Sequence, residues 1–267
     1  MGVAMSSLAQ RYQQLGFLAV EPIISAIDAA RHRQRLEAAE AQLGPLHYLS
    51  KVHTILRSPL ELATHPRALD IAESLLGPDV MLFDATYIVK EPQSEAHVSW
   101  HQDLTYWGFD GDEQVTMWLA LSPATAESGC MRMVPGSHHN GQFQHEDIDD
   151  ETNVLHRGQT VRSVSEDAAQ MCPLQPGEAS FHHGWTLHAS MPNRSKDRRI
   201  GLNVQYITPR MRQLVNPNET AILVRGKDHY GHYQPDLPAS ADLDPAAIAA
   251  HAEKDRARKA VWDQAGR

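Results

Sequence analysis

The pattern of hydrophobic and polar positions predicts helices in the first part of the chain and at its end, with a β-rich region between them. A glycine directly follows each of the N-terminal helical segments, as is common where a helix stops. We expect these helices to pack against the outside of a sheet. The predicted helices are 6–15, 22–43, 59–76 and 244–264.

From residue 80 onward, short segments rich in β-branched and aromatic residues alternate with turn residues. Residues 115–121 are apolar on both faces, as a central strand of a sheet is. The predicted strands are 17–20, 80–83, 86–90, 98–104 (running into a loop), 115–121, 129–134, 178–181, 185–190 and 198–208. Short strands separated by turns indicate a mainly β protein with flanking helices, built on a jelly roll, the double-stranded β-helix of cupins.

The same pattern suggests a division of the chain into regions. We expect one domain over residues 1–267, with a mostly helical N-terminal cover over 1–78 and a jelly-roll core over 79–209. Within the core, residues 138–170 are polar and long for a plain connection, which favours a loop or lid over a substrate. Residues 210–267 form a tail that ends in the last helix.

Composition and charge narrow the class of protein. The chain has 267 residues, of which 42% are hydrophobic and 21% charged, as in ordinary globular proteins. The net charge of −9 argues against a nucleic-acid partner. The two cysteines stand in no paired motif, and there is neither a signal-peptide pattern nor an apolar run long enough to span a membrane. We therefore expect a cytoplasmic protein with no membrane partner; its oligomeric state is not indicated.

The segment Val98–Leu104 contains the first candidate for metal chemistry. Side chains two apart on a strand point to the same face, so His101 and Asp103 would share one. Two histidines and one carboxylate, with coordination positions left open, are the ligands of non-haem Fe(II) oxygenases. On its own, the triplet fits a hydrogen bond between His101 and Asp103 at a strand end better than a metal site, since such triplets are common.

Two later strands carry polar residues on one face. On 185–190, Thr186, His188 and Ser190 share a face that needs partners if it is buried. On 198–208, alternation places Arg199 inward with Gly201, and leaves Arg198 outward. An inward guanidinium suggests a bound carboxylate, which it can hold through two parallel hydrogen bonds; a salt bridge to an internal Asp or Glu is the alternative.

With these residues in this order, the chain resembles the phytanoyl-CoA dioxygenase family of Fe(II)/2-oxoglutarate oxygenases, in particular its ectoine hydroxylase-like members. The resemblance extends over nearly the whole sequence, in order, spacing and alternation. The segments that carry it are Tyr12–Phe17, Ser99–Asp103, Met117–Leu121, Val134–His138 and His188–Ser190, together with Asn193, Ser195 and Arg199.

The resemblance implies a jelly roll that holds Fe(II) through His101, Asp103 and His188. It also implies that 2-oxoglutarate is a co-substrate with O2. Arg199, eleven residues after His188, matches the family's arginine for the distal carboxylate of 2-oxoglutarate, and Ser190 matches its hydroxyl partner. Trp107 matches an aromatic residue that lines the co-substrate site in ectoine hydroxylase-like members.

One departure from the family pattern and one comparison with related halogenases refine this expectation. Such members carry a glutamine for the co-substrate seventeen residues before the first histidine, where this chain has Asp84. A carboxylate facing 2-oxoglutarate would repel it, so we assign the role to Thr86, which shares the face of Asp84. The halogenases related to the family carry Ala or Gly in place of Asp103, so its presence favours insertion of oxygen over halogenation.

We therefore expect a dioxygenase that oxidises an aliphatic C–H bond of a small polar metabolite, preferably by hydroxylation, and releases succinate and CO2. Oxidative cyclisation or desaturation by the same oxidant remains open. So do a metal-binding cupin that recognises a ligand without turnover and a zinc-dependent hydrolase. The joint presence of Arg199 and Ser190 favours the oxygenase over both, because neither alternative needs them.

Overall fold

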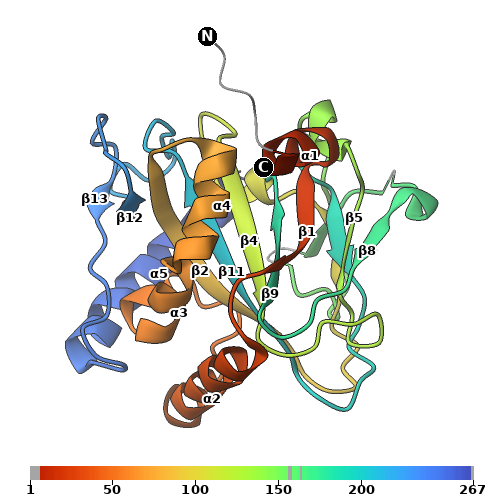
Figure 1. The fold of residues 1–267 in the computed structure, drawn as a ribbon, viewed down its shortest axis with the longest axis horizontal. Helices are drawn as coiled ribbons and strands as arrows, with labels where there is room; N and C mark the ends of the chain where they lie inside the picture. Colours follow the sequence, from red (N-terminus) through yellow and green to blue (C-terminus); the bar gives the residue numbers. More distant parts are fainter. Residues whose placement is uncertain (1–6, 156–157, 163, 266–267) are drawn as a thin grey trace.

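The computed structural model describes residues 7–155, 158–162 and 164–265. Two β-sheets face each other, and the predicted jelly roll with flanking helices is confirmed (Figure 1). The larger sheet has the order β1-β9-β4-β11-β2-β12-β13, and the smaller has the order β3-β10-β5-β8. All neighbouring strands are antiparallel except β12 and β13.

The elements have the following bounds. The larger sheet consists of β1 (Phe17–Pro22), β2 (Val80–Lys90), β4 (Gln114–Ala120), β9 (Glu178–His182), β11 (Arg199–Ile207), β12 (Thr220–Arg225) and β13 (Gln234–Pro235). The smaller sheet consists of β3 (Val98–His101), β5 (Met131–Met133), β8 (Gln170–Cys172) and β10 (His188–Ser190). Outside both sheets, β6 (Glu146–Asp147) and β7 (Gln159–Thr160) form a separate pair. The helices are α1 (Ser7–Leu15), α2 (Ala26–Leu43), α3 (Arg57–Ala63), α4 (Pro66–Leu76) and α5 (Pro245–Ala265), with 3-10 turns η1 (Val52–Thr54), η2 (Asp103–Tyr106), η3 (Ser137–Asn140) and η5 (Glu166–Ala168).

The main hydrophobic core lies between the N-terminal helices and the outer face of the larger sheet. Helices α3 and α4 pack on β2 and β4 (Figure 1). On β11 the odd and even positions separate as the sequence predicts: Ile200, Leu202 and Val204 enter this core, whereas Asn203 and Gln205 line a pocket between the sheets. The inner face of the larger sheet is therefore free to build a site.

The prediction of one continuous helix over 59–76 is wrong. The structure has two helices, α3 and α4, separated at Thr64 and His65. His65 adopts φ −58° and ψ 131°, which is the extended conformation that a following proline favours. Pro66 then begins α4 at the first helical position, where its missing N–H costs no hydrogen bond. Ser6, at which the first helix was predicted to begin, lies outside the described residues.

The predicted strands 80–83 and 86–90 form a single strand, β2, which contains a bulge. Gln205 pairs with Asp84 but Tyr206 pairs with Leu82, so Phe83 is an extra residue opposite β11. A bulge of this kind breaks the alternation of side chains along a strand. Phe83 and Asp84 consequently both reach α5, as described below.

The segments predicted as loops contain short elements. Residues 138–170 include η3, β6, β7 and η5, and the tail after residue 209 includes β12 and β13 before α5. Strands β6, β7 and β13 have two residues each and are too short to leave a periodic pattern in the sequence, whereas β12 has six residues and was not predicted. In the described parts of the chain, no helix combines the length and apolar character needed to cross a membrane.

Candidate metal centre

His101, Asp103 and His188 converge between the two sheets. One ligand atom from each lies within 4.8 Å of the others, and all three side chains are buried. The same Asp103 oxygen, Oδ1, lies 3.5 Å from Nε2 of His101 and 3.6 Å from Nε2 of His188. An ion about 2.1 Å from each ligand atom would have neighbouring ligands roughly 3 Å apart, so the group fits a metal ion with little movement.

Both imidazoles are oriented by backbone carbonyls. Nδ1 of His101 lies 2.9 Å from the carbonyl oxygen of Ser99, and Nδ1 of His188 lies 3.0 Å from that of Thr186. A proton on Nδ1 donates to the carbonyl in each case, which leaves the Nε2 lone pair free for a metal. A simple hydrogen bond from His101 to Asp103 does not account for the second imidazole beside the same oxygen.

The other oxygen of Asp103 is held by two donors. Thr116 Oγ donates to Oδ2 at 3.1 Å, and Nε2 of His182 lies 3.2 Å from it. Burial alone would raise the pKa of Asp103, but the neighbouring His188, His101 and His182 hold it well below the usual value. Burial lowers the pKa of His188. The carboxylate is therefore ionised and His188 neutral, which are the protonation states that a metal requires.

The local geometry differs from the predicted strand. β3 ends at His101, and Asp103 is the first residue of η2. The two ligands meet because the chain turns at Gln102, whose side-chain Nε2 donates to the carbonyls of Gly141 and Trp185 at 2.8 Å each. His188 lies directly opposite His101 in the antiparallel pair β3–β10, and their ring centroids are 4.0 Å apart.

The predicted strand 185–190 is shorter than expected, because β10 comprises His188–Ser190 only. Thr186 does not share the polar face with His188 and Ser190. Its hydroxyl donates to the carbonyl of Gly16 at 2.8 Å, and its N–H closes a turn on His183.

Arg199 is buried and lines the same pocket as the metal ligands, whereas Arg198 is partly exposed and pairs with Glu40 and Glu91. Within the described residues, Nε and Nη1 of Arg199 have no hydrogen-bond partner, and no carboxylate forms an ion pair with it. Its guanidinium carbon lies 4.4 Å from the centroid of Trp118. Burial lowers the pKa of Arg199 to about 10, so it stays charged at neutral pH. A buried cation with free N–H groups requires an anion.

A second buried basic side chain lies beside Arg199. Lys90 is its direct partner in the register of β2 and β11. Its Nζ donates to Ser190 Oγ at 2.7 Å, to Ser190 O at 3.1 Å and to Met191 O at 2.6 Å, all of them uncharged acceptors. Gly201 has no room for a side chain, because a Cβ there would come within 1.9 Å of the Trp118 ring. The glycine thus allows Trp118 to lie under Arg199.

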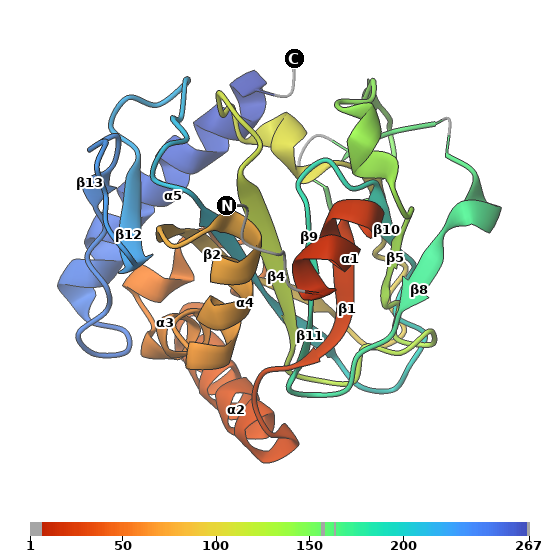
Figure 2. The same ribbon diagram turned by 45° about the horizontal axis from the view of Figure 1, so that its top comes forward.

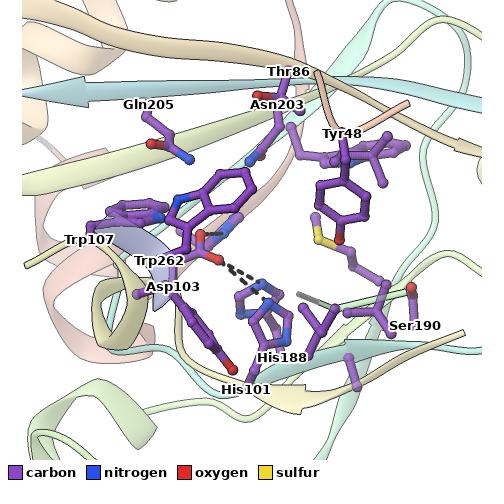
Figure 3. A pocket seen from close by; sticks show the side chains of 18 of the residues that line it. Tyr48, Thr86, His101, Asp103, Trp107, His188, Ser190, Asn203, Gln205 and Trp262 are labelled. Carbon is purple, nitrogen blue, oxygen red and sulfur yellow. Dashed lines mark hydrogen bonds and ion pairs between the residues drawn. The ribbon is translucent and has the colours of Figure 1, made fainter. Parts of the chain in front are cut away.

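The ligands and Arg199 open into one pocket of about 110 Å³ between the sheets. Ser190 and Tyr48 lie on one side of Asp103, whereas Trp107, Trp262 and Gln205 lie on the other (Figure 3). We call Arg199, Ser190 and the adjoining Lys90 the charged end, and Trp107, Trp262 and Gln205 the aromatic end.

The remaining predicted residues occupy different places. Thr86 lines the pocket from β2, and Trp107 lines it at the aromatic end (Figure 3). Their roles toward a co-substrate stay predictions. Asp84 is not among the lining residues: its carboxylate accepts a hydrogen bond from the N–H of Lys51 at 2.5 Å and lies 3.5 Å from Nε of Arg258. The expected repulsion between Asp84 and a co-substrate therefore does not arise.

Sequence reasoning missed several residues of the pocket. His182 ends β9 in no motif, and Tyr48 adopts φ 56°, an uncommon conformation that no sequence signal announces. Trp262 comes from α5, more than seventy residues after the last predicted ligand. Asn203 and Gln205 were not missed, because alternation along the strand predicts that they share the inward face of Arg199, and both line the pocket.

Comparison with known proteins gives these observations a context. A family model described as phytanoyl-CoA dioxygenase (PhyH) matches residues 12–201. The chain is 28% identical over 118 residues to a probable alpha-ketoglutarate-dependent hypophosphite dioxygenase of Stutzerimonas stutzeri, a match that covers 43% of this chain and 41% of that protein. It is 33% identical over 131 residues to phytanoyl-CoA dioxygenase 1 of Oryza sativa subsp. japonica, covering 47% and 44%. These matches thus span less than half of either relative.

Among solved structures, the apo form of the non-heme monooxygenase ThoJ superposes with a TM-score of 0.84 at 29% identity, covering 97% of this chain and 98% of that chain. The predicted enzyme class and the predicted cofactors, iron(II) and 2-oxoglutarate, agree with these relatives and with the His-Asp-His group. The family model covers well over half of the sequence, and this chain therefore belongs to the phytanoyl-CoA dioxygenase family.

Proposed function

We propose that the protein is an Fe(II)/2-oxoglutarate-dependent dioxygenase that oxidises an aliphatic C–H bond of a small molecule, preferably by hydroxylation, and releases succinate and CO2. The observation that carries this proposal is a metal-ligand group in the same pocket as a buried guanidinium that has no carboxylate partner among the described residues. The first calls for a cation and the second for an anion, and 2-oxoglutarate bound to iron meets both requirements.

His101, Asp103 and His188 would hold the iron. Bound iron, 2-oxoglutarate and O2 together would supply the oxidising power, which no protein side chain provides. The chain contributes geometry: backbone carbonyls fix both imidazoles, and Thr116 and His182 fix Asp103. Asp103 fills a ligand position of its own, which favours transfer of oxygen over transfer of halide.

The co-substrate would lie toward the charged end. Arg199 would donate two parallel hydrogen bonds to its distal carboxylate, with Ser190 as a further donor. Lys90 already donates to Ser190 Oγ, so the hydroxyl proton of Ser190 is free to point at the carboxylate. Thr86 and Trp107 would complete the walls of the co-substrate site.

Substrate, partners and location belong to the same proposal. We propose a small polar metabolite as substrate, without a nucleic-acid or membrane partner, and one domain acting in the cytoplasm. Both cysteines are free and buried, which suits a reducing compartment. Cyclisation or desaturation of such a substrate would need the same residues.

An anaerobic titration tests the proposal. Iron(II) and 2-oxoglutarate are added without oxygen, the visible charge-transfer band of the chelate is recorded, and succinate is measured after O2 is admitted. We expect a band and slow succinate release even without substrate. A protein that binds iron but gives neither band nor succinate would be a metal-binding cupin, and hydrolysis of an ester with zinc in place of iron would indicate a hydrolase.

A further inference from the structure

The C-terminal helix α5 forms part of the pocket. It runs along the side of the larger sheet opposite to α3 and α4 (Figures 1 and 2). It packs against η2, the turn that begins at Asp103, and places Trp262 in the pocket wall. Trp107 and Trp262 belong to one hydrophobic cluster, together with Phe83 of β2. The aromatic end is therefore assembled from α5, η2 and the larger sheet.

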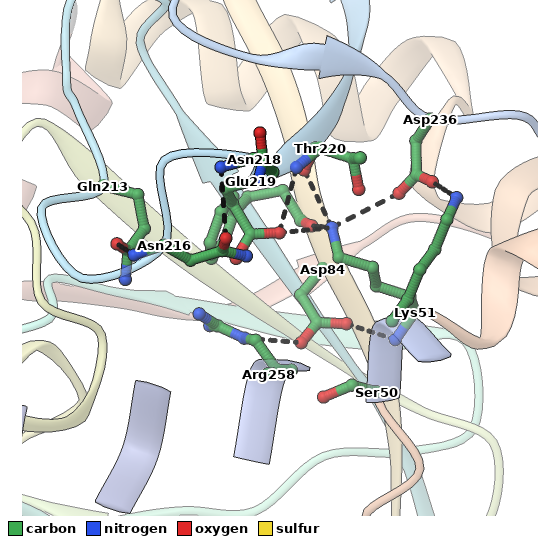
Figure 4. Close-up of polar contacts among 12 residues, drawn as sticks. Ser50, Lys51, Asp84, Gln213, Asn216, Asn218, Glu219, Thr220, Asp236 and Arg258 are labelled. Carbon is green, nitrogen blue, oxygen red and sulfur yellow. Dashed lines mark hydrogen bonds and ion pairs between the residues drawn. The ribbon is translucent and has the colours of Figure 1, made fainter. Parts of the chain in front are cut away.

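Buried charges fix α5 in this position (Figure 4). Arg258 lies with its Nε 3.5 Å from Asp84, and its guanidinium carbon lies 4.4 Å from the centroid of Phe83. The bulge in β2 allows both of these neighbouring residues to face the helix. Asp84 in turn accepts the N–H of Lys51, so α5 is tied to the segment before η1.

The same arginine orients a polar group of the pocket. Nη2 of Arg258 donates to Oε1 of Gln205 at 3.2 Å. With its oxygen engaged behind the wall, Gln205 presents its NH2 group to the pocket, beside Trp107 and Trp262 (Figure 3). A carboxamide NH2 donates to a neutral or anionic acceptor and repels a cation.

The distribution of charges around the pocket indicates whether a neutral, anionic or cationic substrate fits the aromatic end. Histidines apart, the charged lining residues that the structure describes are Asp103, a metal ligand, and Arg199 at the charged end. Among these described residues, none offers a cation at the aromatic end for an anionic substrate. A cationic substrate would also be disfavoured, because the guanidinium carbon of Arg258 lies 5.9 Å from the centroid of Trp262 and already engages that ring.

We propose that the aromatic end is the substrate subsite, and that Trp262 and Gln205 select an uncharged, planar group carrying a hydrogen-bond acceptor. This inference rests on the proposed function, since the group would be held beside the iron. Trp262 supplies the apolar face, Gln205 supplies the donor, and Arg258 is a positioning residue for both. Trp107 would line the boundary between substrate and co-substrate.

Three probes of similar size but different charge test this assignment: benzamide, benzoate and benzylammonium. The protein is loaded with Mn(II) and 2-oxoglutarate, and paramagnetic relaxation of the probe protons reports binding close to the metal. We expect benzamide to bind at least roughly tenfold more tightly than the two ions. Trp262→Ala should weaken benzamide binding roughly tenfold, and Trp262→Phe should restore most of it.

Two measurements separate a specific effect from a damaged fold. Trp185→Ala removes a tryptophan of the same hydrophobic cluster that does not line the pocket, and should leave benzamide binding unchanged. The chelate band with iron and 2-oxoglutarate should persist in the Trp262 variants. Absence of the band in the wild-type protein would overturn the proposed function itself. A band that persists while Trp262→Ala leaves benzamide binding unchanged would overturn the subsite alone.

The remaining outcomes also test the assignment of the aromatic end as the substrate subsite. Preferential binding of benzoate or benzylammonium, or no binding of any probe by the wild-type protein, would overturn the assignment. Arg258→Met tests positioning: the preference for benzamide over the ions should fall severalfold while the affinity for 2-oxoglutarate holds. An unchanged preference in that variant would mean that Gln205 does not depend on Arg258.

Discussion

The two ends of the pocket are built on opposite principles. At the charged end, Arg199 and Lys90 are buried side by side, and neither has a carboxylate partner among the described residues. At the aromatic end, the buried Arg258 has a partner in Asp84, and apolar rings form the wall. A buried charge without a partner costs more free energy than one that lies beside an opposite charge, and a bound counterion offsets part of that cost. We therefore expect one end to bind an anion and the other to disfavour ions.

The two ends also depend on different parts of the fold. The charged end is held by β2, β10 and β11, so its geometry depends on sheet register. The aromatic end depends on how α5 docks, through a few buried side chains. We expect changes at one end to leave the other largely unaffected, and the following predictions test that independence in order of decreasing effect.

The largest effect should come from the metal site that both ends share. His188→Ala removes one of the imidazoles beside Asp103 and should lower succinate formation by at least roughly a thousandfold, because iron is held too weakly to react. Iron content and succinate release are the measurements. His139→Ala, which removes an exposed imidazole, is the matched control and should retain activity. Near-normal turnover in His188→Ala would remove the basis for the comparison.

Arg199→Ala should have the next largest effect and should act on the charged end alone. Loss of two charge-assisted hydrogen bonds predicts roughly a hundredfold weaker binding of 2-oxoglutarate. Iron affinity should stay nearly constant. Titration of the chelate band and a separate iron titration distinguish the two quantities.

Arg198→Ala is the control for this experiment, because Arg198 is the adjacent surface arginine with its own carboxylate partners. It should change neither affinity. Equal loss of iron and 2-oxoglutarate binding in Arg199→Ala would mean that the arginine supports the fold of the site instead of the co-substrate.

A structural feature can be predicted from the sequence when it depends on residues close together in the chain, and is missed when it depends on residues far apart. Alternation along a single strand is local, so the inward position of Arg199 on β11 could be read directly from the sequence. The main strands of the jelly roll were predicted for the same reason. The break between α3 and α4 was missed although Pro66 signals it. The bulge at Phe83 was missed because it exists only in the pairing of β2 with β11.

The candidate site shows the same limit. His101 and Asp103 were proposed from their spacing, and a resemblance that covers β3, η2 and β10 joined His188 to them, although the strand alternation proposed for Asp103 was wrong. Trp262 was missed because its place in the pocket depends on the docking of Arg258 against Asp84. Such docking is a contact between residues far apart in the sequence, and the chain contains no local pattern that specifies it.

The pH dependence of co-substrate binding tests whether Lys90 contributes a charge to the charged end. Burial, followed by the proximity of Arg199, lowers the pKa of Lys90 to about 6. A bound carboxylate would raise it again, so binding above pH 6 takes up a proton and weakens as the pH rises. We expect the dissociation constant of 2-oxoglutarate to increase roughly tenfold from pH 6 to pH 8.

Lys90→Met tests the origin of this effect. The variant should bind 2-oxoglutarate more weakly at pH 6 and show a nearly flat profile up to pH 8. Burial raises the pKa of the nearby Cys130 thiol, which stays neutral over this range, and the other contacts of Lys90 are the Ser190 hydroxyl and backbone carbonyls. A profile as steep as that of the wild-type protein would assign the titration to another group.

The smallest effect is predicted for Thr86→Val, which probes the residue assigned to the place of the missing glutamine. The substitution keeps the shape and removes one hydroxyl, which makes a long contact of 3.5 Å with Asp84. Because a single neutral hydrogen bond contributes about 1 kcal/mol, 2-oxoglutarate should bind about threefold more weakly. The chelate titration measures this change, and benzamide binding should hold constant because Thr86 is not part of the aromatic end. Unchanged affinity for 2-oxoglutarate would mean that the charged end holds the co-substrate without Thr86. Asp84 would then serve only to hold α5 in place.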